Sequence, residues 1–211
     1  MTGPRPGRSD RRAGASTAAK PASARTLGHG QEVRLIGGLW RRSKLPVLDK
    51  PGLRPTPDRV RETLFNWLGQ DLSGWRCLDA FAGSGALGFE AASRGAAEVL
   101  LLERDAELVR QLRSSQQRLQ AEALRVECAD AVSWMKRCAP SRFELVLLDP
   151  PFDAGLQAVA LAAAAPLVVP GGCLYLESPA ALDGADIPQG LALHRQGRAG
   201  LVHYHLLQRN S

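Results

Sequence analysis

The stretch Cys77-Leu78-Asp79-Ala80-Phe81-Ala82-Gly83-Ser84-Gly85-Ala86-Leu87-Gly88 decides the fold of this chain. Its first part, residues 77–81, is mostly apolar and predicts a buried strand. The glycines that follow predict a tight loop, and the apolar residues up to about Arg94 predict a helix. A strand, a glycine loop and a helix in this order are typical of a parallel α/β sheet.

Strands and helices continue to alternate towards the C-terminus. Further strands are expected at residues 99–103, 124–128, 143–148, 173–177, 191–193 and 201–207. Helices are expected from 105 to about 123, at 131–138 and at 156–167, with a turn at 170–172. A short Gly-containing loop between the last two strands indicates that they are antiparallel. We therefore expect an α/β fold: a doubly wound, seven-stranded sheet that is mostly parallel and has an antiparallel last strand.

Two segments are expected to precede this sheet. Residues 1–30 are rich in Gly, Pro, Ala, Ser and Arg and lack hydrophobic periodicity, so they are predicted to be a disordered basic tail. Residues 31–50 are predicted to form a basic β-hairpin arm, with strands at 33–36 and 45–48. The main domain is then expected to span residues 51–211.

The main domain is predicted to open on a helix. Thr56 can cap this helix, Pro57 suits its first position, and Asp58 complements its dipole. The buried face that helical spacing predicts consists of Val60, Leu64, Trp67 and Leu68. Arg59 and Arg61 lie off this face, and we expect them to be available to a partner.

Positive charge is concentrated in the first 62 residues, which hold 14 Lys or Arg and 5 Asp or Glu, whereas the rest hold 13 and 16. A basic end on a near-neutral body indicates a polyanionic partner; for residues 1–30 a solvated tail without a role is an equal alternative. In the arm, Trp40 stands among Arg34, Arg41, Arg42 and Lys44. This mixture suits nucleic acid, because phosphates take the charges and a base can stack on the ring. Anchoring of the arm to the main domain is the equal alternative for Trp40.

The cysteines and the apolar stretches exclude several classes of protein. The four cysteines are widely spaced and form no Cys-x-x-Cys pair, so we expect reduced thiols and no metal site. Charges, Gly or Pro interrupt the apolar stretches well short of the roughly 20 residues that span a membrane. No apolar segment follows the basic N-terminus, so no secretory signal is expected. The expectation is a cytoplasmic protein without a membrane partner.

The glycine loop at residues 83–88 matches the pattern Gly-x-Gly-x-x-Gly, and Glu103 ends the next predicted strand. Both features fit a dinucleotide site, where glycines admit the ligand and the acid accepts hydrogen bonds from a ribose. Here, however, Asp79 sits at the end of the strand, and Phe81 and Ala82 intervene before the first glycine. The pattern Asp-x-Phe-x-Gly-x-Gly, from Asp79 to Gly85, resembles the first motif of class I S-adenosylmethionine methyltransferases. The Asp79 carboxylate suits that cofactor because the cofactor carries ammonium and sulfonium charge.

The tetrapeptide Asp149-Pro150-Pro151-Phe152 directly follows the predicted strand 143–148. Ligands of open α/β sheets bind outside the carboxyl ends of the strands. The prolines lack N–H donors, so their carbonyls and the Asp149 carboxylate form an acceptor-only surface that suits an exocyclic –NH₂. Phe152 can stack on the plane of a base. The structural alternative is that Asp149 and Pro150 merely form a turn that ends the strand.

Asp149-Pro150-Pro151-Phe152 resembles the (Asn/Asp)-Pro-Pro-(Tyr/Phe/Trp) motif of methyltransferases that act on adenine N6, cytosine N4 or guanine N2. In such a site, hydrogen bonds from both N–H groups to Asp149 and to the Pro150 carbonyl would orient the nitrogen for an in-line displacement. Positioning and fixed dipoles supply most of the acceleration in this arrangement. Asp149 need not be a full general base, because the amine becomes acidic only after attack.

Residues 33–45, 51–66, 78–88 and 149–152 together resemble the RsmD family of bacterial 16S rRNA (guanine-N2)-methyltransferases, and the match runs from about Val33 to Arg209. The resemblance implies S-adenosylmethionine as cofactor and the small ribosomal subunit with its 16S rRNA as partner. We expect the protein to be a monomer. One departure is that Arg41-Arg42-Ser43-Lys44 stands where the family usually has Arg-Gly-Arg-Lys. Loss of that glycine is expected to change the turn of the arm.

The resemblance assigns residues to three tasks. The catalytic residues it implies are Asp149, Pro150, Pro151 and Phe152. The cofactor-binding residues are Thr56, Asp79, Phe81, Gly83, Gly85, Glu103, Asp130 and Ala131. The rRNA-binding residues are Arg34, Trp40, Arg41, Arg42, Lys44, Arg54, Arg59 and Arg61.

For Asp130, capping of the next helix is the structural alternative, and both roles can hold together. For the whole protein, an adenine-N6 methyltransferase on DNA or RNA and a non-catalytic ribosome-assembly or RNA-binding factor stay open as alternatives.

Overall fold

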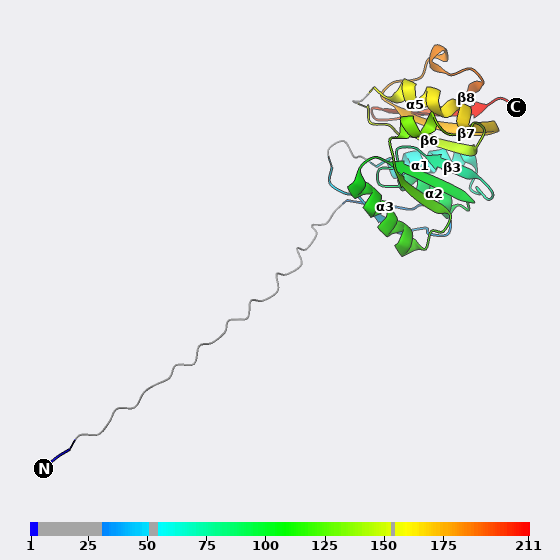
Figure 1. Cartoon of the computed structure of the whole chain (residues 1–211). Helices are drawn as coiled ribbons and strands as arrows, with labels where there is room; N and C mark the ends of the chain where they lie inside the picture. Colours follow the sequence, from blue (N-terminus) through cyan, green and yellow to red (C-terminus); the bar gives the residue numbers. More distant parts are fainter. Residues whose placement is uncertain (4–30, 51–54, 153–154) are drawn as a thin grey trace.

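The computed structural model of the protein describes residues 1–3, 31–50, 55–152 and 155–211. The predicted basic tail, residues 1–30, lies almost wholly outside the described residues. The described chain forms a seven-stranded sheet flanked by helices and a separate two-stranded arm (Figure 1).

The seven strands are ordered β5-β4-β3-β6-β7-β9-β8 across the sheet. They are β3 (Arg76–Asp79), β4 (Glu98–Glu103), β5 (Leu124–Cys128), β6 (Phe143–Leu148), β7 (Val168–Ser178), β8 (Leu191–Ala199) and β9 (Val202–Arg209). The strands β3 to β7 pair in parallel, β9 pairs antiparallel with β7, and β8 pairs antiparallel with β9. This confirms the predicted α/β sheet with its antiparallel C-terminal end.

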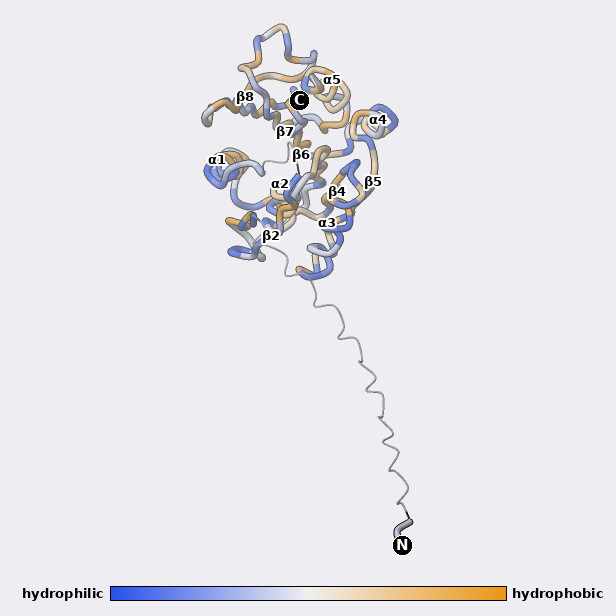
Figure 2. Tube along the Cα trace, turned by 90° about the vertical axis from the view of Figure 1, so that its left-hand side faces the viewer, coloured by the Kyte–Doolittle hydropathy of each residue, from blue (hydrophilic) through white to orange (hydrophobic). Residues whose placement is uncertain are grey.

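Helices cover both faces of the sheet. They are α1 (Asp58–Leu68), α2 (Ala86–Ser93), α3 (Ala106–Leu119), α4 (Ala131–Met135) and α5 (Gln157–Ala164), with short 3-10 helices η2 (Ala165–Leu167) and η3 (Gly184–Asp186). The first three contribute to the hydrophobic cluster on one face, and α4 and α5 to the cluster on the other. Figure 2 shows α1 and α4 on opposite sides of the central strands. None of the described helices combines the length and apolar content needed to cross a bilayer.

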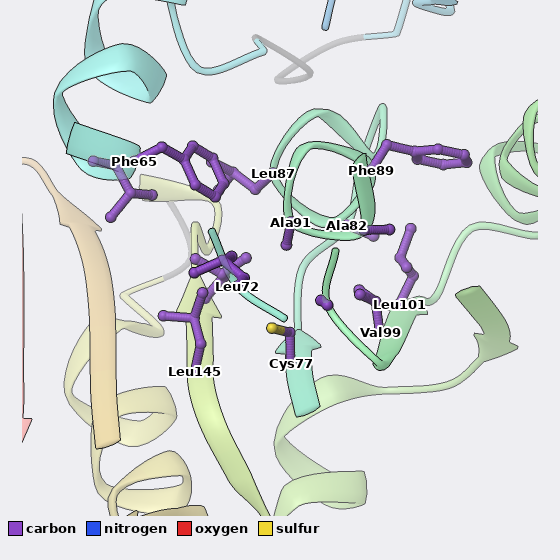
Figure 3. Close-up of a cluster of buried hydrophobic side chains, with 14 of the residues drawn as sticks. Phe65, Leu72, Cys77, Ala82, Leu87, Phe89, Ala91, Val99, Leu101 and Leu145 are labelled. Carbon is purple, nitrogen blue, oxygen red and sulfur yellow. The ribbon is translucent and has the colours of Figure 1, made fainter. Parts of the chain in front are cut away.

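The strands are apolar on both faces because successive side chains point to opposite sides. In β3, Cys77 belongs to the cluster under α1 to α3, and Leu78 belongs to the cluster under α4 and α5. Figure 3 shows the first of these clusters, with Cys77 and Leu101 of the strands on the side of the sheet that faces α2. Burying a side chain such as Leu101 stabilises the fold by roughly 1.5–3 kcal/mol.

Two strands are longer than predicted. The pairing of β7 with β6 shifts register between Phe143 and Leu145, so β7 takes in the predicted turn at 170–172 as an irregularity of the strand. β8 continues to Ala199 through exposed polar residues. A hydrophobic pattern does not reveal this part of β8, because the strand forms the edge of the sheet.

The arm is the predicted hairpin, with β1 (Glu32–Arg34) antiparallel to β2 (Lys44–Pro46). Its turn docks on the C-terminal end of α2. The N–H of Leu39 donates to the Ser93 carbonyl at 2.7 Å, and the N–H of Trp40 donates to the Ser93 hydroxyl at 2.9 Å. The Ser93 hydroxyl donates in turn to the Gly37 carbonyl at 2.6 Å. The arm is therefore attached to the main domain by its backbone.

The carboxylate of Glu90 on α2 is the centre of this attachment, and its side chain is completely buried. Its oxygens accept the N–H groups of Ile36 and Gly37, both at 2.8 Å. Arg94, one turn further along α2, donates to the same carboxylate at 2.7 and 2.9 Å. These donors compensate the cost of burying a charge.

Gly38 allows the close approach of the arm to α2. It has a φ of +72°, and a Cβ at this position would lie 1.8 Å from the Ser93 carbonyl oxygen. Only glycine can adopt this left-handed backbone conformation and also fit in the space available.

We expect Gly38→Ala to detach the arm, and Gly171→Ala is the matched control. Gly171 has a φ of +76°, and a Cβ there would meet nothing within 4 Å. The control should therefore lose only the strain of a left-handed alanine, about 1–2 kcal/mol of unfolding free energy. Trypsin cleavage of the native protein after Arg41 or Arg42, mapped by mass spectrometry, should accelerate by roughly tenfold or more in Gly38→Ala alone, because cleavage follows the detached population. Equal cleavage rates in the two variants would contradict this account of Gly38.

Candidate active site

An acidic residue stands at the carboxyl end of every parallel strand. In the spatial order of the strands these residues are Asp130 after β5, Glu103 in β4, Asp79 in β3, Asp149 after β6 and Glu177 in β7. We call this set the acidic row. Because parallel strands end at the same edge of a sheet, the row occupies the place where ligands of such folds bind.

The glycine loop between β3 and α2 is tied to two members of the row. The N–H of Gly88 donates to Asp79 Oδ2 at 2.9 Å, and the N–H of Gly83 donates to Glu103 Oε2 at 3.0 Å. Gly85 has a φ of +82°, and a Cβ there would lie 2.7 Å from Leu112. The predicted strand, glycine loop and helix are thus present, and Asp79, Gly83, Gly85 and Glu103 lie together.

The Asp79 side chain is buried, although the sequence assigns it to contact with a ligand. It is almost fully buried, and burial raises the pKa of its carboxyl to about 7, against an ordinary value of 3.8. The Gly88 N–H opposes this rise in pKa, and the charge of Glu103 adds to it. Phe81, which follows β3, is half-buried.

Asp130 caps α4, as its structural alternative predicted. Its Oδ1 accepts the Ser133 N–H at 2.8 Å, and this backbone bond lowers the pKa of Asp130. Asp130 is exposed, whereas Ala131, the first residue of the helix, is buried. Contact of Asp130 with a ligand stays a prediction.

The Asp149-Pro150-Pro151-Phe152 corner follows β6 directly, as predicted. Asp149 and Phe152 are half-buried, Pro150 is buried and Pro151 is exposed. Since β6 pairs with β3 and β7, the corner stands between the glycine loop and Glu177. Burial raises the pKa of Asp149 well above its usual range, and the charges of Glu177 and Asp79 raise it further. The corner is thus a crowded, acceptor-rich edge.

Thr56 does not cap α1, and this part of the prediction is wrong. The helix begins at Asp58 with no side-chain cap. The Thr56 hydroxyl instead donates to Glu177 Oε1 at 2.8 Å and lies 3.4 Å from Asp149 Oδ2. A buried hydroxyl between two carboxyl groups gains more from them than from a helix end open to water. Thr56 therefore belongs to the site.

The predicted RNA-binding residues fall into four groups, of which Arg61 and Trp40 are described below. Arg34, Arg41, Arg42, Lys44 and Arg59 are exposed, and Lys44 forms an ion pair with Glu32 at 2.6 Å. Arg54 lies outside the described residues. Arg42 has a φ of +71° at the position where the family usually has glycine, so the turn keeps a left-handed residue in spite of the substitution.

The prediction that Arg61 binds RNA is wrong, because its side chain is fully buried. Its guanidinium donates to the carbonyls of Arg34 at 2.8 Å and Thr56 at 3.2 Å. It also pairs with Asp58 at 2.6 Å and with Glu90 at 3.6 Å. Arg61 lies outside the apolar buried face of α1, on a side of the helix that the arm covers.

Trp40 is half-buried and packs against the hydrophobic cluster under α1 to α3. This packing supports the alternative in which Trp40 anchors the arm to the main domain. Stacking of Trp40 on a base stays a prediction.

Sequence reasoning missed Glu177 and Tyr175. Glu177 is 3% exposed, and its Oε1 also accepts the Tyr175 hydroxyl at 2.9 Å. The signal that could have found Glu177 is its position at the end of a predicted parallel strand, which it shares with the rest of the acidic row.

Known proteins are similar to this chain in sequence and in fold. The family model described as "Conserved hypothetical protein 95" matches residues 33–208. Ribosomal RNA small subunit methyltransferase D of Escherichia coli K12 is 44% identical over 186 residues, which cover 87% of this chain and 93% of that protein. The protein of the same name from Haemophilus influenzae is 43% identical over 183 residues, covering 84% and 94%.

Solved structures give the same result. The structure described as putative methyltransferase yhhF from Escherichia coli is 40% identical with a TM-score of 0.77, covering 85% of this chain and 99% of that one. The putative methylase HI0767 from Haemophilus influenzae is 37% identical with a TM-score of 0.72, covering 86% and 100%. The chain therefore belongs to the "Conserved hypothetical protein 95" family, which is the RsmD family that its motifs resemble.

Proposed function

We propose that this protein transfers a methyl group from S-adenosylmethionine to the exocyclic N2 of a guanine in 16S rRNA of the small ribosomal subunit. The observation that carries the proposal is the Asp149-Pro150-Pro151-Phe152 corner, which stands beside the glycine loop at one edge of the sheet. The names of the relatives support the substrate class, small-subunit ribosomal RNA.

The corner suits an aromatic amine. An exocyclic –NH₂ offers two donors and its lone pair is delocalised into the ring. Hydrogen bonds to Asp149 and to the Pro150 carbonyl hold both N–H groups and orient the nitrogen, while Phe152 stacks on the base. In the transfer a bond would form between this nitrogen and the methyl carbon while the sulfur–methyl bond breaks. The methylated nitrogen would then release one proton to the Asp149 carboxylate that accepts its N–H. The guanine must leave its stack to reach this corner, as base-modifying enzymes require.

The acidic row fits a cationic cofactor. Among the described residues, no Lys or Arg forms an ion pair with Asp79, Glu103, Asp149 or Glu177. S-adenosylmethionine supplies a sulfonium-bound methyl when it is present. Asp79 and the glycine loop with Gly83 and Gly85 would hold its charged end, Glu103 its ribose, and Asp130 with Ala131 its adenine. Phe81 and Thr56 would flank it.

The remaining assignments follow from this proposal. The exposed cations of the arm and Arg59 bind rRNA, and Arg54 takes part with them. The chain is organised as a basic tail at residues 1–30, the arm at 31–50 and a methyltransferase domain at 51–211. It acts as a monomer in the cytoplasm.

The decisive experiment is transfer of a labelled methyl group from S-adenosylmethionine to small subunits from cells that lack this protein. Digestion of the product to nucleosides should yield N2-methylguanosine as the labelled nucleoside. N6-methyladenosine would instead identify an adenine-N6 enzyme, since the corner does not name the base. Absence of any transfer would leave a non-catalytic assembly or RNA-binding factor.

We expect Asp149→Ala to lower turnover by roughly 10²–10³-fold, because it removes an acceptor that is fixed before the reaction. Cofactor affinity, measured by calorimetry, should stay within about fivefold of wild type, since one hydrogen bond of about 1 kcal/mol at most is at stake there. Asp130→Ala is the matched control, because it removes another acid of the row and should weaken cofactor binding more than turnover. Retained turnover in Asp149→Ala would rule out the role given to Asp149.

Removal of arm charge should weaken RNA binding and flatten its salt dependence. Arg41→Gln with Arg42→Gly removes two exposed cations, and glycine keeps the left-handed turn at position 42. The log–log slope of affinity against salt should fall by about 0.7–0.9 for each phosphate that the arm no longer neutralises. Arg137→Gln, at an exposed position just after α4, should leave the slope unchanged. An unchanged slope in the arm variant would remove the arm from the interface.

A further inference from the structure

The proposed reaction assigns no task to Glu177, although this acid is buried beside the corner. Leu148 of β6 pairs with Leu176 of β7, so Asp149 and Glu177 are the next residues on neighbouring strands. Glu177 Oε1 accepts hydrogen bonds from the hydroxyls of Thr56 at 2.8 Å and Tyr175 at 2.9 Å. Two donors on one buried oxygen fix the orientation of the carboxylate.

The Thr56 hydroxyl connects Glu177 to Asp149. It carries a single proton, and its two carboxyl neighbours lie at 2.8 Å and 3.4 Å. The shorter hydrogen bond, to Glu177, fixes where the hydroxyl lies, and the same proton makes the longer, weaker contact with Asp149 Oδ2. Asp149 therefore accepts its hydrogen bond from a hydroxyl whose position Glu177 determines.

The backbone of Thr56 is held from the other side. Its carbonyl accepts a hydrogen bond from Arg61 Nε at 3.2 Å, and the residue is 5% exposed. Thr56, which precedes α1, is thus fixed at both its backbone carbonyl and its side-chain hydroxyl. Loss of the Glu177 bond would free only the hydroxyl, which is the group that faces Asp149.

We propose that Glu177 is a positioning residue for the methyl transfer, which holds the Thr56 hydroxyl against Asp149 and thereby keeps the Asp149 carboxyl aimed at the amino group of the base. The inference rests on the proposed function, in which Asp149 orients that amino group. Glu177 acts through Thr56 and touches no reacting atom.

Charge gives Glu177 a second, measurable effect on Asp149. After burial, the Glu177 carboxylate is the main cause of the raised pKa of Asp149; Asp79 on β3 raises it further, and the Thr56 hydroxyl lowers it. Tyr175 stays a neutral donor, because burial and the Glu177 charge raise its pKa. Removal of the Glu177 charge should therefore lower the pKa of Asp149, so that Asp149 becomes an acceptor-only carboxylate at lower pH.

The first test is a double-mutant cycle of Glu177→Ala and Thr56→Val, with methyl transfer to small subunits at saturating cofactor. Each single change should lower kcat by roughly ten- to hundredfold through misplacement of Asp149, with KM for the subunits little changed. The double variant should be no slower than the slower single variant, because both changes break the same hydrogen bond. Additive losses, or wild-type turnover in Glu177→Ala, would overturn the proposal.

Conservative variants provide the second test and do not depend on the alanine variant folding. Glu177→Gln keeps a carbonyl oxygen for Thr56 and Tyr175 but loses the charge, and Thr56→Ser keeps the hydroxyl. Both should restore kcat to near the wild-type value at high pH. In Glu177→Gln the acid limb of the kcat profile should also move to lower pH, whereas a merely structural Glu177 would leave it in place.

A third readout needs no turnover. In apoprotein with ¹³C-labelled aspartate carboxyls, the Asp149 resonance, assigned by its loss in Asp149→Asn, should titrate at lower pH in Glu177→Gln than in wild type. An unchanged midpoint would overturn the coupling. Failure of the proposed function is distinct, because the wild-type protein would then transfer no methyl group to small subunits whatever these variants show.

Discussion

The arrangement of the arm, α1 and α2 depends on the buried carboxylate of Glu90. A carboxylate in an apolar interior is stable only when donors surround it. Arg94 supplies some of them from the same helix, and the others come from Ile36 and Gly37, more than 50 residues earlier in the chain. Removing one partner of such a buried pair costs about 3–5 kcal/mol, so this interaction outweighs any exposed ion pair of the arm. Because α2 is also the helix that the glycine loop opens, the arm is fixed against the loop that we assign to the cofactor.

Arg61 extends this attachment to the proposed catalytic corner. The same guanidinium donates to the Arg34 carbonyl in the arm and to the Thr56 carbonyl before α1. Thr56 in turn contacts Asp149 and Glu177. A continuous set of hydrogen bonds therefore joins the backbone of the arm to the corner, while the cationic side chains of the arm face outward. If those cations bind rRNA, the nucleic acid and the acceptor corner are held in a fixed relation, which is what positioning of a flipped base demands.

How well each part of the structure could be predicted depended on whether its determining interactions are local in the sequence. Strand β6 was predicted to the residue because both faces are buried and the run is apolar throughout, whereas most of β8 was not predicted because its edge position leaves polar residues exposed. The glycine loop and the corner were found because they are local patterns that follow strands. The capping role of Thr56 and the RNA-binding role of Arg61 were wrong predictions because the partners of both residues come from distant segments. Neither residue type nor helical spacing shows that the arm would cover Arg61 or that a carboxyl group of β7 would compete for the Thr56 hydroxyl.

Burial of the acidic row lowers the stability of the free protein near neutral pH, although the same carboxyl groups form the proposed binding site. The pKa of Asp79 rises from 3.8 to about 7 in the folded chain, so its contribution to stability is fully present below about pH 4 and is lost as pH rises through 7. Burial raises the pKa of Asp149 and Glu177 as well, and their contributions change with pH in the same direction. A cation bound at this edge favours the charged forms and removes part of that cost. The same burial that weakens the free protein near neutral pH would therefore add to the affinity for the proposed sulfonium cofactor, because the bound cation favours the charged carboxylates.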